Sequence, residues 1–93
     1  MNLNNLGLAK AARGIITGED KVVEKIRQKK VFLVILASDS GNSTTKKIKD
    51  KASFYGIDIN CEHTSEELSQ AIGEVNIHVI GVTNRGFVKI LEK

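Results

Sequence analysis

The stretch VFLVILA at residues 31–37 is apolar without interruption. A strand with one face in water alternates apolar and polar residues, whereas a strand covered on both faces does not. We therefore expect residues 31–37 to form a central strand of a sheet that carries helices on both faces. The apolar segment at residues 77–82 predicts a second strand of this kind.

Amphipathic segments on both sides of this stretch predict helices. Residues 18–28 carry an apolar stripe of Val22, Val23 and Ile26 at helical spacing. Further helices are expected over residues 3–13, from residue 42 or 43 to 55, between 64 and 73, and from 83 or 84 onward, and short strands at residues 15–16 and 57–61. Helices and strands alternate with short loops, which predicts an α/β fold, a layered α/β/α sandwich, in a single domain of residues 1–93.

Residue types at the element boundaries predict how the helices begin and end. Thr17 with Asp20, and Thr64 with Glu67, have the spacing of a capping box. Gly14 is expected to end the first helix, and Gly56 and Gly73 to end later ones. In the last helix Phe87, Ile90 and Leu91 are expected to face the core.

Charge is distributed unevenly along the chain of 93 residues, whose formal net charge is +3. Residues 1–51 hold eleven Lys/Arg and five Asp/Glu, whereas residues 52–93 hold three and six. Lys21, Lys25 and Lys29 recur at helical spacing. The asymmetry predicts one basic face that could meet a polyanion, although solvated lysines alone would give the same composition.

The sequence argues against several other classes of protein. No apolar run approaches the length of a membrane span, and the N-terminus lacks the features of a signal peptide. Cys61 is the only cysteine, which favours a reducing, cytoplasmic location, and its place in an alternating strand predicts a buried side chain. With His63 and His78 the only histidines, we expect neither a metal site nor a general base, no cofactor and no enzymatic activity.

Aromatic residues are scarce, with three Phe and one Tyr. Most of them fall on expected core stripes, so an aromatic platform for single-stranded RNA is not expected. A polar loop at residues 38–43 leaves a small enzyme open as the weakest alternative.

Several pieces of the sequence, in order, resemble a known family. The chain is similar to the small ribosomal-protein family of kink-turn RNA binders typified by archaeal L7Ae, and more closely to its bacterial YlxQ-type members. The matching pieces are Leu6–Ala9, Ala12–Arg13, Thr17–Asp20, Val22–Val23, Leu33–Asp39, Thr44–Lys47, Ile72–Gly73 and Gly81–Phe87. The resemblance implies a three-layer α/β/α sandwich with a small mixed four-stranded sheet, and binding of structured RNA such as kink-turns.

The family's RNA motif, glycine-x-asparagine-glutamate-x-x-lysine, is only partly matched here. In the register that keeps the glycine at Gly18, the asparagine, glutamate and lysine of the motif fall on Asp20, Lys21 and Glu24. A register one residue earlier puts the asparagine–glutamate pair on residues 18–19 and an apolar residue at the lysine position. Asp20 accepts hydrogen bonds but cannot donate them as asparagine does, so the choice of RNA is expected to differ from the family pattern.

The resemblance implies an RNA-binding surface made of the start of the helix at residues 18–28, two loops and nearby lysines. The expected RNA-binding residues are Gly18, Glu19, Asp20, Lys21, Glu24, Lys25, Ser38, Asp39, Ser40, Lys46, Lys47, Gly73, Glu74, Val75 and Asn76. The expected partner is ribosomal or other kink-turn RNA, bound by a monomer away from membranes. A protein–protein adaptor on the same fold stays open, because an acidic partner could dock on the same lysines.

Overall fold

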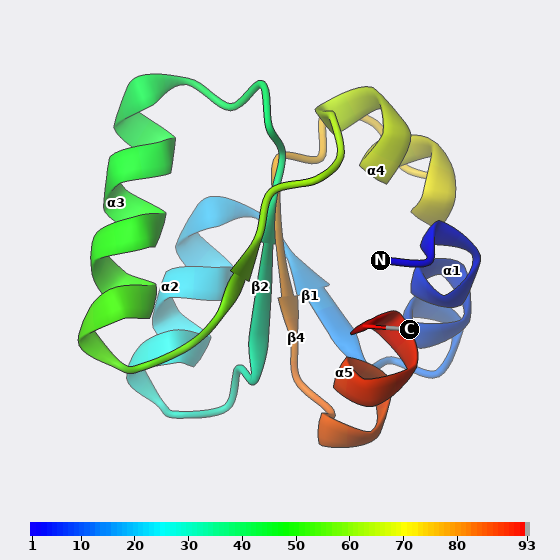
Figure 1. The fold of residues 1–93 in the computed structure, drawn as a ribbon, viewed down its shortest axis with the longest axis horizontal. Coiled ribbons are helices and arrows are strands. Elements are labelled where there is room, and N and C mark those ends of the chain that lie inside the picture. The colour runs from blue at the N-terminus through cyan, green and yellow to red at the C-terminus, as the bar shows by residue number, and fades with distance from the viewer. Residues whose placement is uncertain (93) are drawn as a thin grey trace.

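A four-stranded sheet lies between two layers of helices in the computed structural model, which describes residues 1–92 (Figure 1). The strands lie in the order β1-β4-β2-β3, so β4 and β2 are central. β4 is antiparallel to both β1 and β2, whereas β3 is parallel to β2, and the sheet is therefore mixed. The strands are β1 (Ile15–Thr17), β2 (Leu33–Leu36), β3 (Ile59–Asn60) and β4 (Val79–Val82).

Helices cover both faces of this sheet, as the sequence predicts (Figure 1). One layer holds α1, α4 and α5, and the other holds α2 and α3. Their bounds are α1 (Leu3–Ala11), α2 (Glu19–Arg27), α3 (Asn42–Phe54), α4 (Ser65–Ile72) and α5 (Arg85–Glu92). The expected three-layer α/β/α sandwich with a mixed four-stranded sheet is confirmed.

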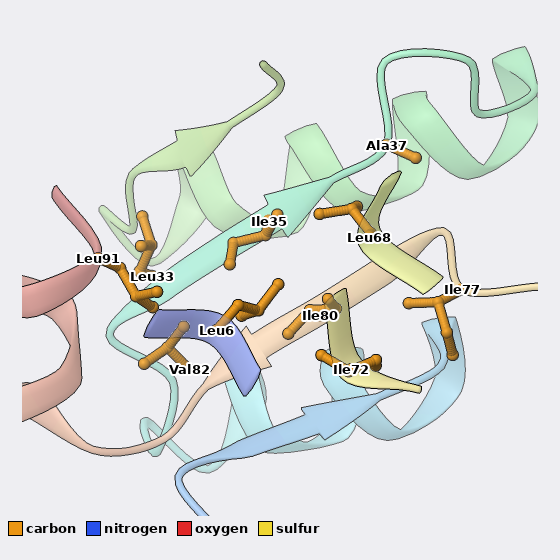
Figure 2. Packing of buried hydrophobic residues seen from close by; sticks show 10 residues of the cluster. All are labelled: Leu6, Leu33, Ile35, Ala37, Leu68, Ile72, Ile77, Ile80, Val82 and Leu91. Atoms are coloured by element: carbon orange, nitrogen blue, oxygen red, sulfur yellow. The ribbon is translucent and has the colours of Figure 1, made fainter. Parts of the chain in front are cut away.

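Two apolar cores, one on each face of the sheet, hold the layers together. Figure 2 shows the first, which α1, α4 and α5 build with the sheet from Leu6, Leu33, Ile35, Ala37, Leu68, Ile72, Ile77, Ile80, Val82 and Leu91. The second consists of Val22, Val23, Ile26, Val31, Val34, Leu36, Ile48 and Val79. Successive β2 residues enter alternate cores, which explains the continuous apolar stretch, and each fully buried aliphatic side chain contributes about 1.5–3 kcal/mol.

The end of α1 differs from the expectation that Gly14 ends this helix. Arg13 takes the left-handed backbone there, with φ 59°. A Cβ at Gly14 would lie 2.6 Å from Cδ2 of Phe87. Gly14 is therefore needed because an aromatic ring packs directly on its backbone, rather than because it ends the helix. Gly56 and Gly73 do end their helices with positive φ, as predicted.

The edge strand β3 is shorter than the predicted strand over residues 57–61. The Asn60 side-chain oxygen accepts a hydrogen bond from the Glu62 N–H at 3.1 Å, a local turn that directs the chain away from the sheet. Cys61 consequently does not pair with β2, and its side chain is exposed instead of buried.

The last two elements also depart in detail from the sequence expectation. β4 begins at Val79, so His78 precedes the strand and is exposed. In α5, Leu91 is buried and Phe87 packs on the core, but Ile90 is 40% exposed. Within residues 1–92, no helix combines the length and apolar character that crossing a bilayer would require.

Candidate nucleic-acid interface

The first turn of α2 has no side-chain cap. Thr17 is the last residue of β1, paired with Ile80, so the predicted capping box with Asp20 is wrong. Gly18 is the N-cap residue, with φ 97° and ψ 139°, and its N–H donates to the Val79 carbonyl at 3.0 Å. Glycine adopts this backbone without strain. Because Gly18 and not Thr17 is the cap residue, no side chain makes a capping hydrogen bond to α2. The first turn therefore keeps N–H groups that an external acceptor can use.

Two acidic side chains flank this turn and share one lysine of α3. Lys47 Nζ lies 3.6 Å from a carboxylate oxygen of Glu19 and 3.6 Å from one of Asp20. The Asp20 side chain is 94% exposed, so these ion pairs are weak individually. Lys47 thus partly offsets the negative charge of the turn and ties the start of α2 to α3.

The loop between β2 and α3 is held to its neighbours by hydrogen bonds. Asp39 accepts a hydrogen bond from the Ser65 N–H at 2.8 Å and so helps to cap α4. The Ser38 N–H donates to the His63 carbonyl at 2.8 Å. The Ser40 hydroxyl is buried and has no hydrogen-bond partner among the described residues. These contacts fix the loop as part of the scaffold of this surface.

The loop between α4 and β4 is anchored at its start and has an exposed tip. Lys10 donates to the Ile72 carbonyl at 2.7 Å and pairs with Glu74 at 3.0 Å. Asn76 has a left-handed backbone with φ 55°. Val75, which lies between Glu74 and Asn76 in the sequence, is 80% exposed. The loop therefore presents an apolar side chain to solvent on a constrained backbone.

The three predicted segments meet at one end of the sheet. The carboxyl ends of β1 and β2 and the amino end of β4 lie together there, because β4 is antiparallel to both (Figure 1). A hollow of about 320 Å³ joins the start of α2 to both loops, and its lining consists of Thr17, Gly18, Glu19, Gly41, Thr44, Asn76, Ile77, His78 and Val79. We call this surface the α2-start surface.

Of the fifteen predicted RNA-binding residues, only Gly18, Glu19 and Asn76 line this hollow. Lys21, Glu24 and Lys46 are exposed on their helices and are absent from its lining. Lys25 lines a different hollow, toward the end of α2. Lys47 does not line the hollow either, but it forms ion pairs with Glu19, which does, and with Asp20.

Six residues that line this surface were not among those predicted to bind RNA: Thr17, Gly41, Thr44, Ile77, His78 and Val79. Thr44 is one turn before Ile48 on α3, and that spacing was a signal that it shares the inward side of the helix. The sequence predicts His78 within the buried strand at residues 77–82. Its position between Ile77 and Val79 gives the alternation of a partly exposed segment, which could have identified it.

Two carboxyl groups away from the hollow, those of Glu62 and Glu67, take part in hydrogen bonds. The backbone N–H of Thr64 and then the His63 ring hold the pKa of the Glu67 carboxyl below its ordinary value. Hydrogen bonds from the N-terminal ammonium and then from Asn60 likewise hold the pKa of the Glu62 carboxyl below its ordinary value. Residues 1–92 contain no group of three or more metal-ligating side chains placed to hold an ion.

Sequence comparison decides the family. The sequence model of the ribosomal protein L7Ae/L30e/S12e/Gadd45 family matches residues 3–92 of this chain. The chain belongs to this family. Among its L7Ae-family relatives, the RNA-binding protein YlxQ of Bacillus subtilis (strain 168) is 36% identical over 86 residues, which cover 92% of this chain and 86% of that protein. The RNA-binding protein YlxQ of Enterococcus faecium is 37% identical over 87 residues, or 94% and 84% of the two chains. The resemblance to YlxQ-type L7Ae-family members is thereby confirmed.

Solved structures with the L7Ae-family fold agree with this architecture. A protein of unknown function from Bacillus halodurans C is 42% identical and superposes with a TM-score of 0.92 over 97% of this chain and 91% of that one. The Giardia lamblia 15.5kD RNA binding protein has a TM-score of 0.84 over 97% and 78% of the two chains. Its identity of 16% shows a shared fold alone.

Proposed function

We propose that this L7Ae-family protein is a non-enzymatic RNA-binding domain that recognises structured, kink-turn-like RNA through the α2-start surface. Family membership and the two RNA-binding YlxQ relatives support RNA as the partner. The observation that carries the proposal is the meeting of an uncapped helix start with two loops around one hollow. A single compact surface of this kind suits a folded RNA rather than an extended strand.

The chemistry of this surface fits the edge of a bent RNA helix. An A-form major groove is too narrow for side chains, but a sharp kink opens it. Gly18 presents no side chain, and nothing lies within 4 Å of the Cβ position there, so an RNA strand can approach the backbone. The free N–H groups of the first turn suit phosphate or base acceptors. Val75 would pack on a nucleotide that the kink extrudes.

Positive charge supplies the remaining attraction. Lys21 is exposed beside the first turn and can reach a guanine edge or a phosphate. Lys46 and Lys25 would add phosphate contacts that weaken as salt rises. Because Lys47 offsets Glu19 and Asp20, the acidic residues of the turn repel the RNA less than their number suggests.

Replacing Lys21 tests this proposal. Lys21→Glu reverses a charge beside the first turn, and we expect the dissociation constant for a kink-turn RNA to rise by about tenfold or more. Binding is measured by fluorescence anisotropy at fixed low salt. Lys49→Glu is the matched control, because Lys49 is an exposed lysine of α3 that lines none of the hollows described above. Equal losses in the two variants would mean that net charge, and not this surface, determines binding.

A protein–protein adaptor is the competing function, and the incomplete RNA motif favours it. An acidic protein would then dock on the lysines of α2 and α3. The two functions differ in what the purified protein carries, because an RNA binder retains nucleic acid that high salt removes. Protein free of nucleic acid that also fails to bind kink-turn RNA would favour the adaptor.

A further inference from the structure

The end of the molecule opposite the α2-start surface gathers three of the chain's four aromatic residues. Phe54 and Tyr55 stand edge to face with ring centroids 5.0 Å apart, and Phe54 is 81% exposed. Phe32 and Tyr55 line a common hollow of about 390 Å³. Most aromatic residues were expected on core stripes, and Phe54, which ends α3 in solvent, is an exception.

Four basic side chains lie around the Phe32 ring, and one of them, Lys29, also lines the hollow that Phe32 shares with Tyr55. Lys25, Lys29 and Lys30 line a second hollow of about 320 Å³, which Phe32 also lines. The Arg85 guanidinium carbon lies 4.9 Å from the centroid of the Phe32 ring, a cation–π contact. No carboxylate lines either hollow, and within residues 1–92 none of these four cations forms an ion pair.

The backbone of Lys29 belongs to the end of α2. Lys29 follows the helix with φ 60°, a left-handed conformation that glycine adopts without strain and lysine does not. Arg13 has the same backbone after α1, so this conformation is that of a helix end. A lysine at this position keeps a positive charge between the two hollows, both of which it lines.

We propose that this aromatic-end surface, made of Lys25, Lys29, Lys30, Phe32, Phe54, Tyr55 and Arg85, binds a single-stranded nucleotide segment. Exposed rings stack on unpaired bases of any sequence, and unpaired cations neutralise the phosphates between them. A polyanion without bases would use only the cations, so the exposed Phe54 ring favours nucleic acid over an acidic protein. The inference extends the proposed function, because the segment would flank the structured RNA.

The geometry of α2 connects the two surfaces. α2 has nine residues and is about 13 Å long, and the two surfaces lie at its opposite ends. Lys21 and Lys25 stand one turn apart on it, and Lys29 lies two residues after its end. A strand leaving a kink at the start of α2 can therefore follow this row of lysines to the aromatic end.

Three RNAs test the inference by fluorescence anisotropy at one salt concentration. They are a blunt kink-turn, the same kink-turn with a single-stranded extension of about eight nucleotides, and oligouridylate of that length alone. We expect the extension to tighten binding by about tenfold, since stacking of even one base has that effect. Phe54→Ala should abolish this gain and leave the affinity for the blunt kink-turn unchanged.

Two further variants separate folding from binding. Lys29→Gly relieves the left-handed strain, so it should fold at least as stably as the original chain while losing part of the gain from the extension. Lys49→Ala, the matched control, should keep the whole gain. Preserved gain in both Phe54→Ala and Lys29→Gly would overturn the inference.

Two comparisons distinguish nucleic acid from other polyanions, and failure of the proposed function from failure of this inference. If polyglutamate competes as well as oligouridylate of equal charge, the surface binds polyanions in general and the inference is wrong. If the blunt kink-turn does not bind but oligouridylate binds through Phe54, the proposed function fails and the aromatic-end surface still stands. No gain from the extension in the unmodified protein would contradict the inference directly.

Discussion

At the residue scale, Gly18 has the most restricted position in the α2-start surface. Its φ of 97° and ψ of 139° lie in a backbone region that residues with a side chain adopt only with strain. A Cβ there would nevertheless meet no atom within 4 Å. We therefore expect Gly18→Ala to lower the free energy of unfolding by about 1–3 kcal/mol through backbone strain alone. Urea unfolding measures this change.

Gly41→Ala is the matched control for this substitution. Gly41 is also a helix N-cap residue with open space around its Cβ position, but its φ is −62°. We expect a change below about 1 kcal/mol there, because alanine adopts this backbone without strain. Equal destabilisation by the two variants would show that the start of a helix, and not the left-handed backbone, makes the glycine necessary.

Single-residue roles were the hardest to predict from the sequence. Thr17 has the composition and spacing of a cap, but its pairing with Ile80 in β1 takes precedence. Gly14 was assigned to the end of a helix because the Phe87 ring that packs on it is distant in sequence. Cys61 follows an alternating pattern that a local turn of Asn60 interrupts. In each case a long-range contact or a side-chain turn outweighed the local pattern.

At the element scale, α4 has a complete capping box whose strength depends on pH. The Thr64 side chain accepts from the Glu67 N–H, and the Glu67 carboxylate accepts from the Thr64 N–H at 3.0 Å. The lowered pKa of Glu67 means that its contribution to stability is fully present above its ordinary pKa of 4.5 and is lost as pH falls through the folded value. The protein should therefore lose stability below about pH 4.5.

Glu67→Gln isolates this contribution. Glutamine can accept the same hydrogen bond but does not titrate, so the fall in urea midpoint between about pH 7 and about pH 3 should be smaller than in the unmodified protein. Glu66→Gln changes a neighbouring carboxylate outside the capping box and should keep the original pH dependence. Indistinguishable pH profiles for Glu67→Gln and the unmodified protein would contradict the assignment.

Elements with a strong periodic pattern were predicted well from the sequence. The order of helices and strands, the burial of β2 on both faces and the capping box of α4 were all correct. Element ends were less accurate, because a side-chain turn of Asn60 ends β3, and the backbone of Ile77 is hydrogen-bonded to serine side chains of α4 before β4 begins. The meeting of the α2 start with both loops was implied by a family resemblance, since periodicity carries no information on which loops share an end of the sheet.

At the scale of the whole molecule, the mixed sheet determines which element ends lie beside each end of α2. β4 is antiparallel to β1 and β2, so the chain brings the start of α2 and two loops to one end of the sheet. The opposite end receives the ends of α2 and α3 and the start of α5 (Figure 1). The cations of Lys25, Lys29 and Lys30 lie at that second end, although the chain as a whole carries only +3.

The central claim is that the α2-start surface recognises a kinked RNA by its shape. The most direct test compares the dissociation constants for a kink-turn RNA and for a straight duplex of the same length at matched salt. The two RNAs are matched in their number of phosphates, so shape recognition should make the kink-turn bind at least about tenfold more tightly. Equal affinity for the two RNAs would contradict the claim.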